Sequence, residues 1–135
     1  MDLTFGYHQC PLTKSARIFT AFITFAGVYQ FTRLPFGPKR APSHFQQQMA
    51  SVVLAGLIYM VCEMYLDDCI VYAKGNEQFL ERLESVFKRF RLHNIFLKAS
   101  KCKFGLPLVE YVGRQISKEG ISMSDLRIRA VMNFP

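Results

Sequence analysis

The stretch EMYLDDCIVYA, residues 63–73, places two adjacent carboxylates between two apolar runs. The flanking runs are rich in β-branched and aromatic residues, so they predict two strands with Asp67 and Asp68 at the tip between them. Ionised carboxylates favour water, and burying one without a partner costs free energy or shifts its pKa. Two interpretations are open at this point: a turn that uses Asp as an ordinary turn residue, or a tip that holds the pair for a counter-ion.

Upstream of this hairpin the sequence predicts another strand pair and a helix. Residues 20–34 contain two β-rich runs that meet at Ala26-Gly27, which favours a tight hairpin. A Pro-rich loop follows, and Ser43 is expected to cap a helix that ends near Gly56.

Downstream, apolar residues recur at three- and four-residue steps over about residues 76–93, which predicts an amphipathic helix. Residues 108–123 predict further strands that turn at Lys118-Glu119-Gly120, and Ser124 is the expected N-cap of a last helix. Hairpins imply antiparallel pairing, so the predicted fold class is α+β, an antiparallel sheet with helices packed on one face. The opening residues, MDL, are typical of the end of a strand, so the sheet is expected to be incomplete at its N-terminus.

The composition is that of a folded domain with a basic surface. Of 135 residues, 50% are hydrophobic and 20% charged, which allows a real core and argues against disorder. No apolar run reaches the roughly 20 residues of a membrane span, and no signal peptide is visible. The formal charge of +7 favours a polyanionic partner such as nucleic acid, although solubility alone explains it equally well.

The four cysteines do not predict a zinc site. They are Cys10, Cys62, Cys69 and Cys102, and no two of them form a C-x-x-C arrangement. Apolar neighbours around Cys62 and Cys69 favour buried thiols in a reducing compartment.

A metal site at the hairpin tip would need a third carboxylate from elsewhere, because one Asp pair cannot hold two hard divalent cations. Asp2 is the candidate, since it too stands at the end of an apolar run and before a turn. Taken alone, Asp2 would be interpreted as a surface or capping residue, and the Asp67-Asp68 pair as a turn. Two strand ends that each carry a carboxylate make the metal interpretation worth pursuing.

Five stretches of the chain, in this order and at compatible distances, carry a family resemblance. They are MDLTFGYHQ (1–9), TAF (20–22), LPFGPKRAPSHFQ (34–46), YLDDCIVYA (65–73) and EYVGRQIS (110–117). Together they resemble the reverse transcriptase of retroviruses and long-terminal-repeat retrotransposons, most closely the gypsy type. A lone Y-x-D-D would be a weak signal, whereas this ordered set spans essentially the whole chain.

The resemblance implies a polymerase palm and RNA-directed DNA synthesis. Asp2, Asp67 and Asp68 match the three family carboxylates that bind two Mg²⁺ ions, for which Mn²⁺ can substitute. The implied reaction transfers a nucleotide from a dNTP to the 3′-hydroxyl of a primer on an RNA or DNA template.

The resemblance also implies substrate contacts. Tyr7 matches the aromatic residue beneath the incoming sugar, where a ring excludes a 2′-hydroxyl; without the resemblance it would be interpreted as a core aromatic. The other implied dNTP contacts are Phe36, Gly37 and Lys101, the last chosen among three nearby lysines. The implied primer and template contacts are Tyr65, Phe45, Gln46, Val112 and Gly113.

The same resemblance assigns residues 1–135 to a reverse transcriptase palm, with the start of the thumb or connection at about 120–135 and the fingers largely missing. Protease, ribonuclease H and integrase domains are expected in a parent polyprotein, in a cytoplasmic particle or the nucleus. Three hypotheses follow: a polymerase palm, a non-catalytic nucleic-acid-binding relic, or an inert remnant.

Overall fold

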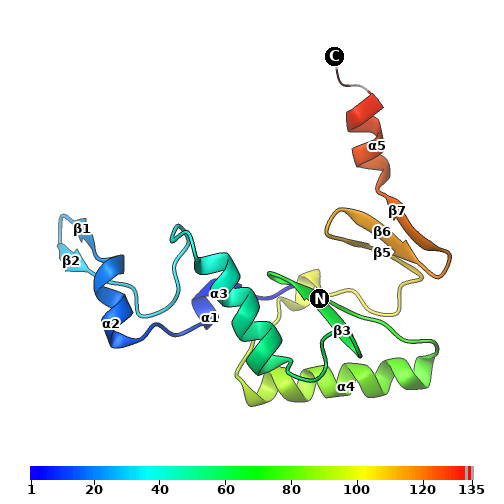
Figure 1. Ribbon diagram of the computed structural model, residues 1–135, viewed down its shortest axis with the longest axis horizontal. Helices are drawn as coiled ribbons and strands as arrows, with labels where there is room; N and C mark the ends of the chain where they lie inside the picture. The colour runs from blue at the N-terminus through cyan, green and yellow to red at the C-terminus, as the bar shows by residue number, and fades with distance from the viewer. Residues whose placement is uncertain (133, 135) are drawn as a thin grey trace.

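The computed structural model describes residues 1–132 and residue 134. Figure 1 shows an elongated arrangement, with β1, β2 and α2 at one end, α3, β3 and α4 in the centre, and β5–β7 with α5 at the other end. The helices are α1 (Gly6–Gln9), α2 (Lys14–Arg17), α3 (Ala41–Gln48), α4 (Asn76–Leu92) and α5 (Asp125–Met132), with short η1 (Ile18–Thr20), η2 (Met49–Val53) and η3 (Ala99–Lys101). The strands are β1 (Phe22–Thr24), β2 (Gly27–Tyr29), β3 (Cys62–Tyr65), β4 (Asp68–Val71), β5 (Leu108–Tyr111), β6 (Arg114–Ser117) and β7 (Gly120–Met123).

All the strand pairs between these elements are antiparallel, which confirms the predicted α+β class. The strands form three separate small sheets, in the orders β1-β2, β3-β4 and β5-β6-β7. The stretch 108–117 is therefore a hairpin of its own, because Tyr111 pairs with Arg114 across a two-residue turn. Sequence periodicity alone did not reveal this turn, whose residues Val112 and Gly113 both have positive φ values, 51° and 69°.

The hydrophobic core lies in the centre of the chain, around β3 and β4. Its fully buried side chains come from α3 and the residues after it, from the β3-β4 hairpin and from α4: they are Phe45, Met49, Leu54, Cys62, Cys69 and Val86. Helix α4 buries Val86 and Phe90 and leaves its charged side exposed, which confirms the predicted amphipathic helix. The core therefore supports the tip of the hairpin that carries Asp67 and Asp68.

The predicted N-cap of α3 was wrong. The helix begins at Ala41 with Arg40 in the capping position, and the Ser43 hydroxyl donates a hydrogen bond to the Arg40 carbonyl at 3.1 Å. Pro42 explains the earlier start, because a proline in the first helical turn has no N–H that needs a partner. Beyond Gln48 the chain continues as the wider turn of η2, which ends at Val53.

The cysteines are free, as predicted. Cys10, Cys62 and Cys69 are buried, and Cys102 is partly exposed. Among the helices of the described residues, none has both the length and the apolar character needed to span a bilayer.

Candidate active site

The β3-β4 hairpin turns within two residues, Leu66 and Asp67, because Tyr65 pairs directly with Asp68. The turn therefore lies one residue earlier than the predicted Asp67-Asp68 tip, and Asp68 is the first residue of β4. Leu66 has a φ of 51°, a conformation that is unfavourable for a residue with a side chain and therefore needs support from its surroundings. Gln46 of α3 supplies that support. Its side-chain amide donates to the Met64 carbonyl at 2.7 Å, and its Oε1 accepts from the Leu66 N–H at 2.8 Å.

The first residues of the chain form a short extended segment beside this tip. Asp2 makes an antiparallel bridge with Asp68, and the Leu3 N–H donates to the Asp67 carbonyl at 3.0 Å. On the other side, the Lys98 N–H donates to the Asp2 carbonyl at 2.9 Å. Asp2 is thus held between two neighbouring segments, and the structure brings it together with Asp67 and Asp68.

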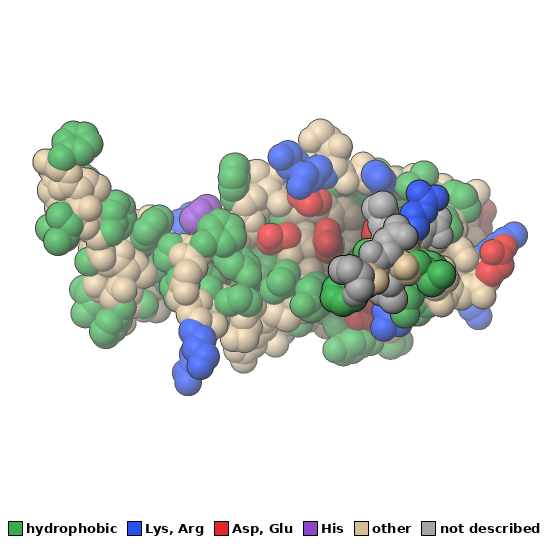
Figure 2. Space-filling view, turned by 90° about the horizontal axis from the view of Figure 1, so that it is seen from above, with side chains coloured by type: hydrophobic (Ala, Val, Ile, Leu, Met, Phe, Trp, Pro, Cys, Tyr) green, Lys and Arg blue, Asp and Glu red, His purple; other side chains and the backbone are tan. Residues whose placement is uncertain are grey.

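The carboxylates repel one another in this arrangement. Burial raises the pKa of Asp67 above its ordinary value, the charges of Asp2 and Asp68 raise it further, and Lys101 lowers it. Asp67 Oδ1 is buried and has no hydrogen-bond partner among the described residues. Lys101 lies on the solvent side, with Nζ at 3.4 Å from Asp2 Oδ2. Figure 2 shows acidic side chains gathered near the middle of one face, with basic side chains beside them.

These features fit a hard divalent cation in their donor chemistry. Carboxylate oxygens are the ligands that Mg²⁺ prefers, and an unpartnered buried oxygen among mutually repelling carboxylates is stabilised by a nearby cation. Within the described part of the chain, no three potential ligand side chains already converge closely enough to enclose an ion. The chain therefore supplies carboxylate ligands that do not by themselves surround an ion.

An aromatic cluster adjoins the carboxylates. Tyr7 is buried, and its ring centroid lies 5.0 Å from that of Phe36 and 5.2 Å from that of Phe45. Burial raises the pKa of Tyr7, with smaller contributions from Asp67 and Tyr65, so its phenol stays neutral. Phe36 is 63% exposed, and Gly37 has a φ of 112° that favours glycine. Tyr7 is therefore both a core residue and a neighbour of Asp67.

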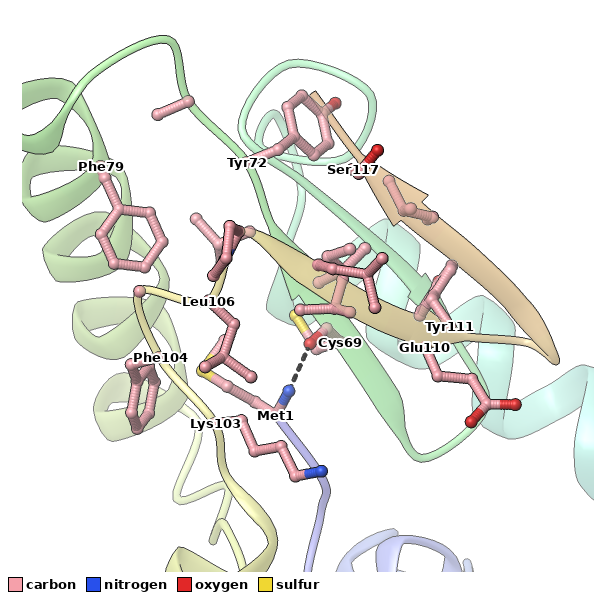
Figure 3. Close-up of a pocket in the computed structure, with 18 of the residues that line it drawn as sticks. Met1, Cys69, Tyr72, Phe79, Lys103, Phe104, Leu106, Glu110, Tyr111 and Ser117 are labelled. Atoms are coloured by element: carbon pink, nitrogen blue, oxygen red, sulfur yellow. Dashed lines mark hydrogen bonds between the residues drawn. The ribbon is translucent and has the colours of Figure 1, made fainter. Parts of the chain in front are cut away.

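The β5-β6 hairpin lies across a cavity from β4. The cavity has a volume of about 1240 Å³ and is lined by residues of β4, α4, the 100–107 segment, β5 and β6. Figure 3 shows Phe79, Phe104 and Leu106 on one side, with Glu110 and Tyr111 on the strand that faces Cys69. Burial raises the pKa of Tyr111, with contributions from Cys69, Glu63 and Asp68. The tip residues Val112 and Gly113 line this cavity and stand apart from the aromatic cluster.

Most of the predicted site residues thus gather around the β3-β4 tip. Asp2, Asp67, Asp68 and Lys101 form its charged part, Tyr7, Phe36 and Phe45 its aromatic part, and Gln46 its clamp. Tyr65 stands at the tip and is half exposed. Phe45 is fully buried, so direct contact with a template is excluded in this conformation.

Sequence reasoning missed two residues: Gly6, whose α-carbon lies against the Asp67 carboxylate, and Gln9. The Gln9 side chain donates to the Phe96 carbonyl at 2.9 Å and accepts from the Phe96 N–H at 2.7 Å. The Thr4 N–H also donates to the Phe96 carbonyl, at 3.0 Å, so Gln9 secures the segment that flanks Asp2. Both residues lie within the stretch 1–9 that carried the family resemblance, and membership of that stretch was the available signal.

Comparisons with known proteins agree with this picture. The family model described as "Reverse transcriptase (RNA-dependent DNA polymerase)" matches residues 1–116. The chain is 36% identical over 135 residues to the retrovirus-related Pol polyprotein from transposon 412 of Drosophila melanogaster, covering 100% of this chain and 11% of the relative. It is 33% identical over 135 residues to that from transposon gypsy of the same species, covering 100% of this chain and 13% of the relative.

The fold has a counterpart among solved structures. The foamy viral protease-reverse transcriptase in complex with double-stranded DNA superposes with a TM-score of 0.85 at 24% identity, covering 100% of this chain and 28% of the viral one. This likeness establishes the fold. The chain therefore spans a small part of the length of each of these proteins.

Proposed function

Because this chain belongs to the reverse transcriptase (RNA-dependent DNA polymerase) family, we propose that it carries the nucleotidyl-transfer site of such an enzyme. The reaction would join a dNTP to the 3′-hydroxyl of a primer on an RNA or DNA template. One observation supports this proposal above the others: Asp2, from the start of the chain, bridges Asp68 beside the Asp67 turn. Carboxylates more than 60 residues apart in sequence thereby meet at one strand end.

Asp2, Asp67 and Asp68 would hold two Mg²⁺ ions, with Mn²⁺ as a substitute. When bound, the ions lower the pKa of the attacking hydroxyl and stabilise negative charge on the reacting phosphate and the leaving pyrophosphate. The protein holds the carboxylates in place through backbone pairing on both sides of Asp2 and through the Gln46 clamp on the turn. Lys101 balances part of the acidic charge on Asp2 and offers a cation to the departing phosphates.

The aromatic cluster would select the nucleotide. Tyr7 is packed against Phe36 and Phe45, so its ring cannot withdraw from a substrate sugar without disturbing the core. A rigid ring beside the sugar rejects a 2′-hydroxyl by steric exclusion, which favours deoxynucleotides. Exposed Phe36 and the left-handed Gly37 would form the surface beneath the incoming dNTP.

Contacts with nucleic acid would come from two tips. Tyr65 and Gln46 belong to the β3-β4 tip, and Val112 and Gly113 to the β5-β6 tip, across the cavity from it. Phe45 would act on the template side through packing under Tyr7, because it is fully buried. The formal charge of +7 supports salt-sensitive binding to phosphates.

The domain assignment is part of the same proposal. Residues 1–135 would form the palm, with the thumb or connection starting at about 120–135. The chain covers 11% and 13% of two Pol polyprotein relatives, so most of the length of those relatives lies in other regions. Protease, ribonuclease H and integrase are the domains we expect there, in a cytoplasmic particle or the nucleus.

Primer extension on an RNA template tests the proposal. The chain is assayed with Mg²⁺ or Mn²⁺ beside two variants that each remove one carboxylate, Asp67→Asn at the tip and Glu84→Gln on the exposed face of α4. Glu84 pairs with Lys88 at 2.8 Å on that exposed face, so it controls for lost charge alone. Metal-dependent extension that Asp67→Asn abolishes and Glu84→Gln preserves supports the proposal.

Other outcomes identify the alternatives. Salt-sensitive binding to a primer-template without extension would favour a non-catalytic nucleic-acid-binding relic. A chain that shows no cooperative unfolding transition would favour an inert remnant.

A further inference from the structure

Gly6, the first residue of α1, lies directly against the carboxylate of Asp67. A Cβ atom on Gly6 would come within 2.0 Å of Asp67 Oδ1 and 3.1 Å of its Cγ. Non-bonded heavy atoms pack best at about 3.5–4.0 Å, so the first of these contacts is sterically forbidden. The Asp67 side chain thus occupies the space that a side chain at position 6 would fill.

Backbone conformation does not explain the glycine. Glycines with positive φ occur elsewhere in the chain, including Gly37 and Gly56, and Gly6 is not one of them. Gly6 is the first residue of the short helix α1, a backbone conformation that residues with a side chain adopt readily. The steric demand at position 6 therefore comes from the Asp67 carboxylate.

The surroundings leave the carboxylate as the part that can give way. The Cβ atom on Gly6 would also lie 3.0 Å from Phe45 Cζ, and Phe45 is fully buried. The Asp67 backbone is secured by the Leu3 N–H, and the turn by Gln46. Any side chain at position 6 would therefore rotate the Asp67 carboxylate out of its place while the backbone stays where it is.

We infer that Gly6 is a positioning residue for Asp67: its bare α-carbon forms the seat in which Oδ1 lies, and so sets where the carboxylate stands relative to Asp2 and Asp68. Oδ1 has no hydrogen-bond partner among the described residues, so shape holds it in the seat. The consequence for metal binding rests on the proposed function. A misplaced carboxylate would weaken the ion site without unfolding the chain.

The test compares Gly6→Ala with Gly75→Ala in the full chain. Gly75 is the matched control, because no atom lies within 4 Å of its added Cβ and its φ is −169°, which any residue adopts. In the metal-free chain, we expect the ¹³C resonance of the Asp67 carboxyl carbon to move in Gly6→Ala and to stay in Gly75→Ala. With Mn²⁺ alone as probe, we expect Gly6→Ala to bind about 10-fold more weakly, in line with the effect of other residues that orient metal ligands.

A double variant shows whether Gly6 acts through Asp67. In the Asp67→Ala background the seat is empty, so adding Gly6→Ala should cause no further loss of Mn²⁺ affinity. An equal loss in both backgrounds, or an unmoved carboxyl resonance in Gly6→Ala, would overturn the inference. If the unaltered chain binds no Mn²⁺, the metal part of the proposed function fails, and the carboxyl resonance still decides the seat.

Discussion

The β1-β2 and β3-β4 hairpins have the same topology and opposite surroundings. Each pairs two short antiparallel strands across a two-residue turn. β3 and β4 bury Cys62, Met64 and Cys69, whereas β1 and β2 contain no buried residue. The β1-β2 hairpin is exposed, with Ile23 in β1 at 84% and Phe25 in the turn at 107% relative accessibility.

The difference teaches where a site can be built. An isolated two-stranded hairpin is marginally stable in water, so β1-β2 has little with which to hold a strained turn or a buried charge. The β3-β4 tip is held by Asp2 and its neighbours on one side and by α3 beneath it. These contacts offset the energetic cost of the left-handed backbone at Leu66 and of the unpartnered Asp67 oxygen.

Truncating one phenylalanine near each hairpin should give the largest contrast. Phe45→Ala removes a fully buried ring that packs on Tyr7, and we expect it to lower the free energy of unfolding by about 3–5 kcal/mol. Phe25→Ala removes an exposed ring and should change it by about 0.5 kcal/mol or less. Urea denaturation of both variants measures this, and equal losses would show that the two hairpins are equally packed.

The next largest difference between the hairpins should be their response to a bound metal ion. If Mn²⁺ binds the carboxylates, a concentration of about 100 times its Kd stabilises the chain by about 2.7 kcal/mol, and EDTA removes that gain. Hydrogen exchange should slow most at the Leu3 and Cys69 amides, which pair beside the tip. Amides of β1-β2 serve as the internal control. If Mn²⁺ slowed exchange more at the β1-β2 amides than at the Leu3 amide, the metal site at the β3-β4 tip would be contradicted.

Two side-chain clamps offer a closer comparison. Gln46 makes two hydrogen bonds to the β3-β4 turn, and Thr24 makes two to the β1-β2 turn, with the Gly27 carbonyl at 3.1 Å and the Ala26 N–H at 3.2 Å. Gln46→Ala should cost about 2 kcal/mol, because partly buried backbone groups lose their partners. Thr24→Ala should cost about 0.5 kcal/mol, because water replaces the lost bonds. Thermal unfolding of both variants measures the two stability losses. Equal losses would show that solvent exposure of the turn does not determine the cost of losing these hydrogen bonds.

Local pattern was enough to predict some of this. The helix at 76–93 follows from its apolar spacing, and the β3-β4 hairpin from its strand-like flanks. The position of its turn was predicted one residue too late, because Asp68 already pairs with Tyr65. The clamp by Gln46, the seat at Gly6 and the exposure of β1-β2 depend on segments far apart in sequence, which single-sequence periodicity does not report. Ser43 failed as a cap because Pro42 allowed α3 to start earlier. The interpretation of Asp2 as a metal ligand likewise needed the family resemblance, because a single aspartate forms no sequence motif by itself.

The smallest expected effect concerns the charge of Asp67 itself. Its pKa is raised in the folded chain, chiefly by burial and then by Asp2 and Asp68, from an ordinary value of 3.8. A carboxyl group whose pKa is raised by folding favours the folded state when protonated. Its contribution is therefore present below pH 3.8 and is lost as the pH rises through the higher folded value.

At neutral pH and without metal, ionised Asp67 should therefore weaken the fold that holds it. Asp67→Asn should raise the urea midpoint of the metal-free chain at pH 7 while abolishing primer extension, and the gain should shrink toward pH 3. Glu84→Gln should instead lower the midpoint slightly, because Lys88 lowers the pKa of Glu84 through their ion pair. A lower midpoint for Asp67→Asn at pH 7 would mean that the carboxylate stabilises the hairpin. Asp67 would then have a structural role at this tip, and the difference from β1-β2 would no longer support a metal site.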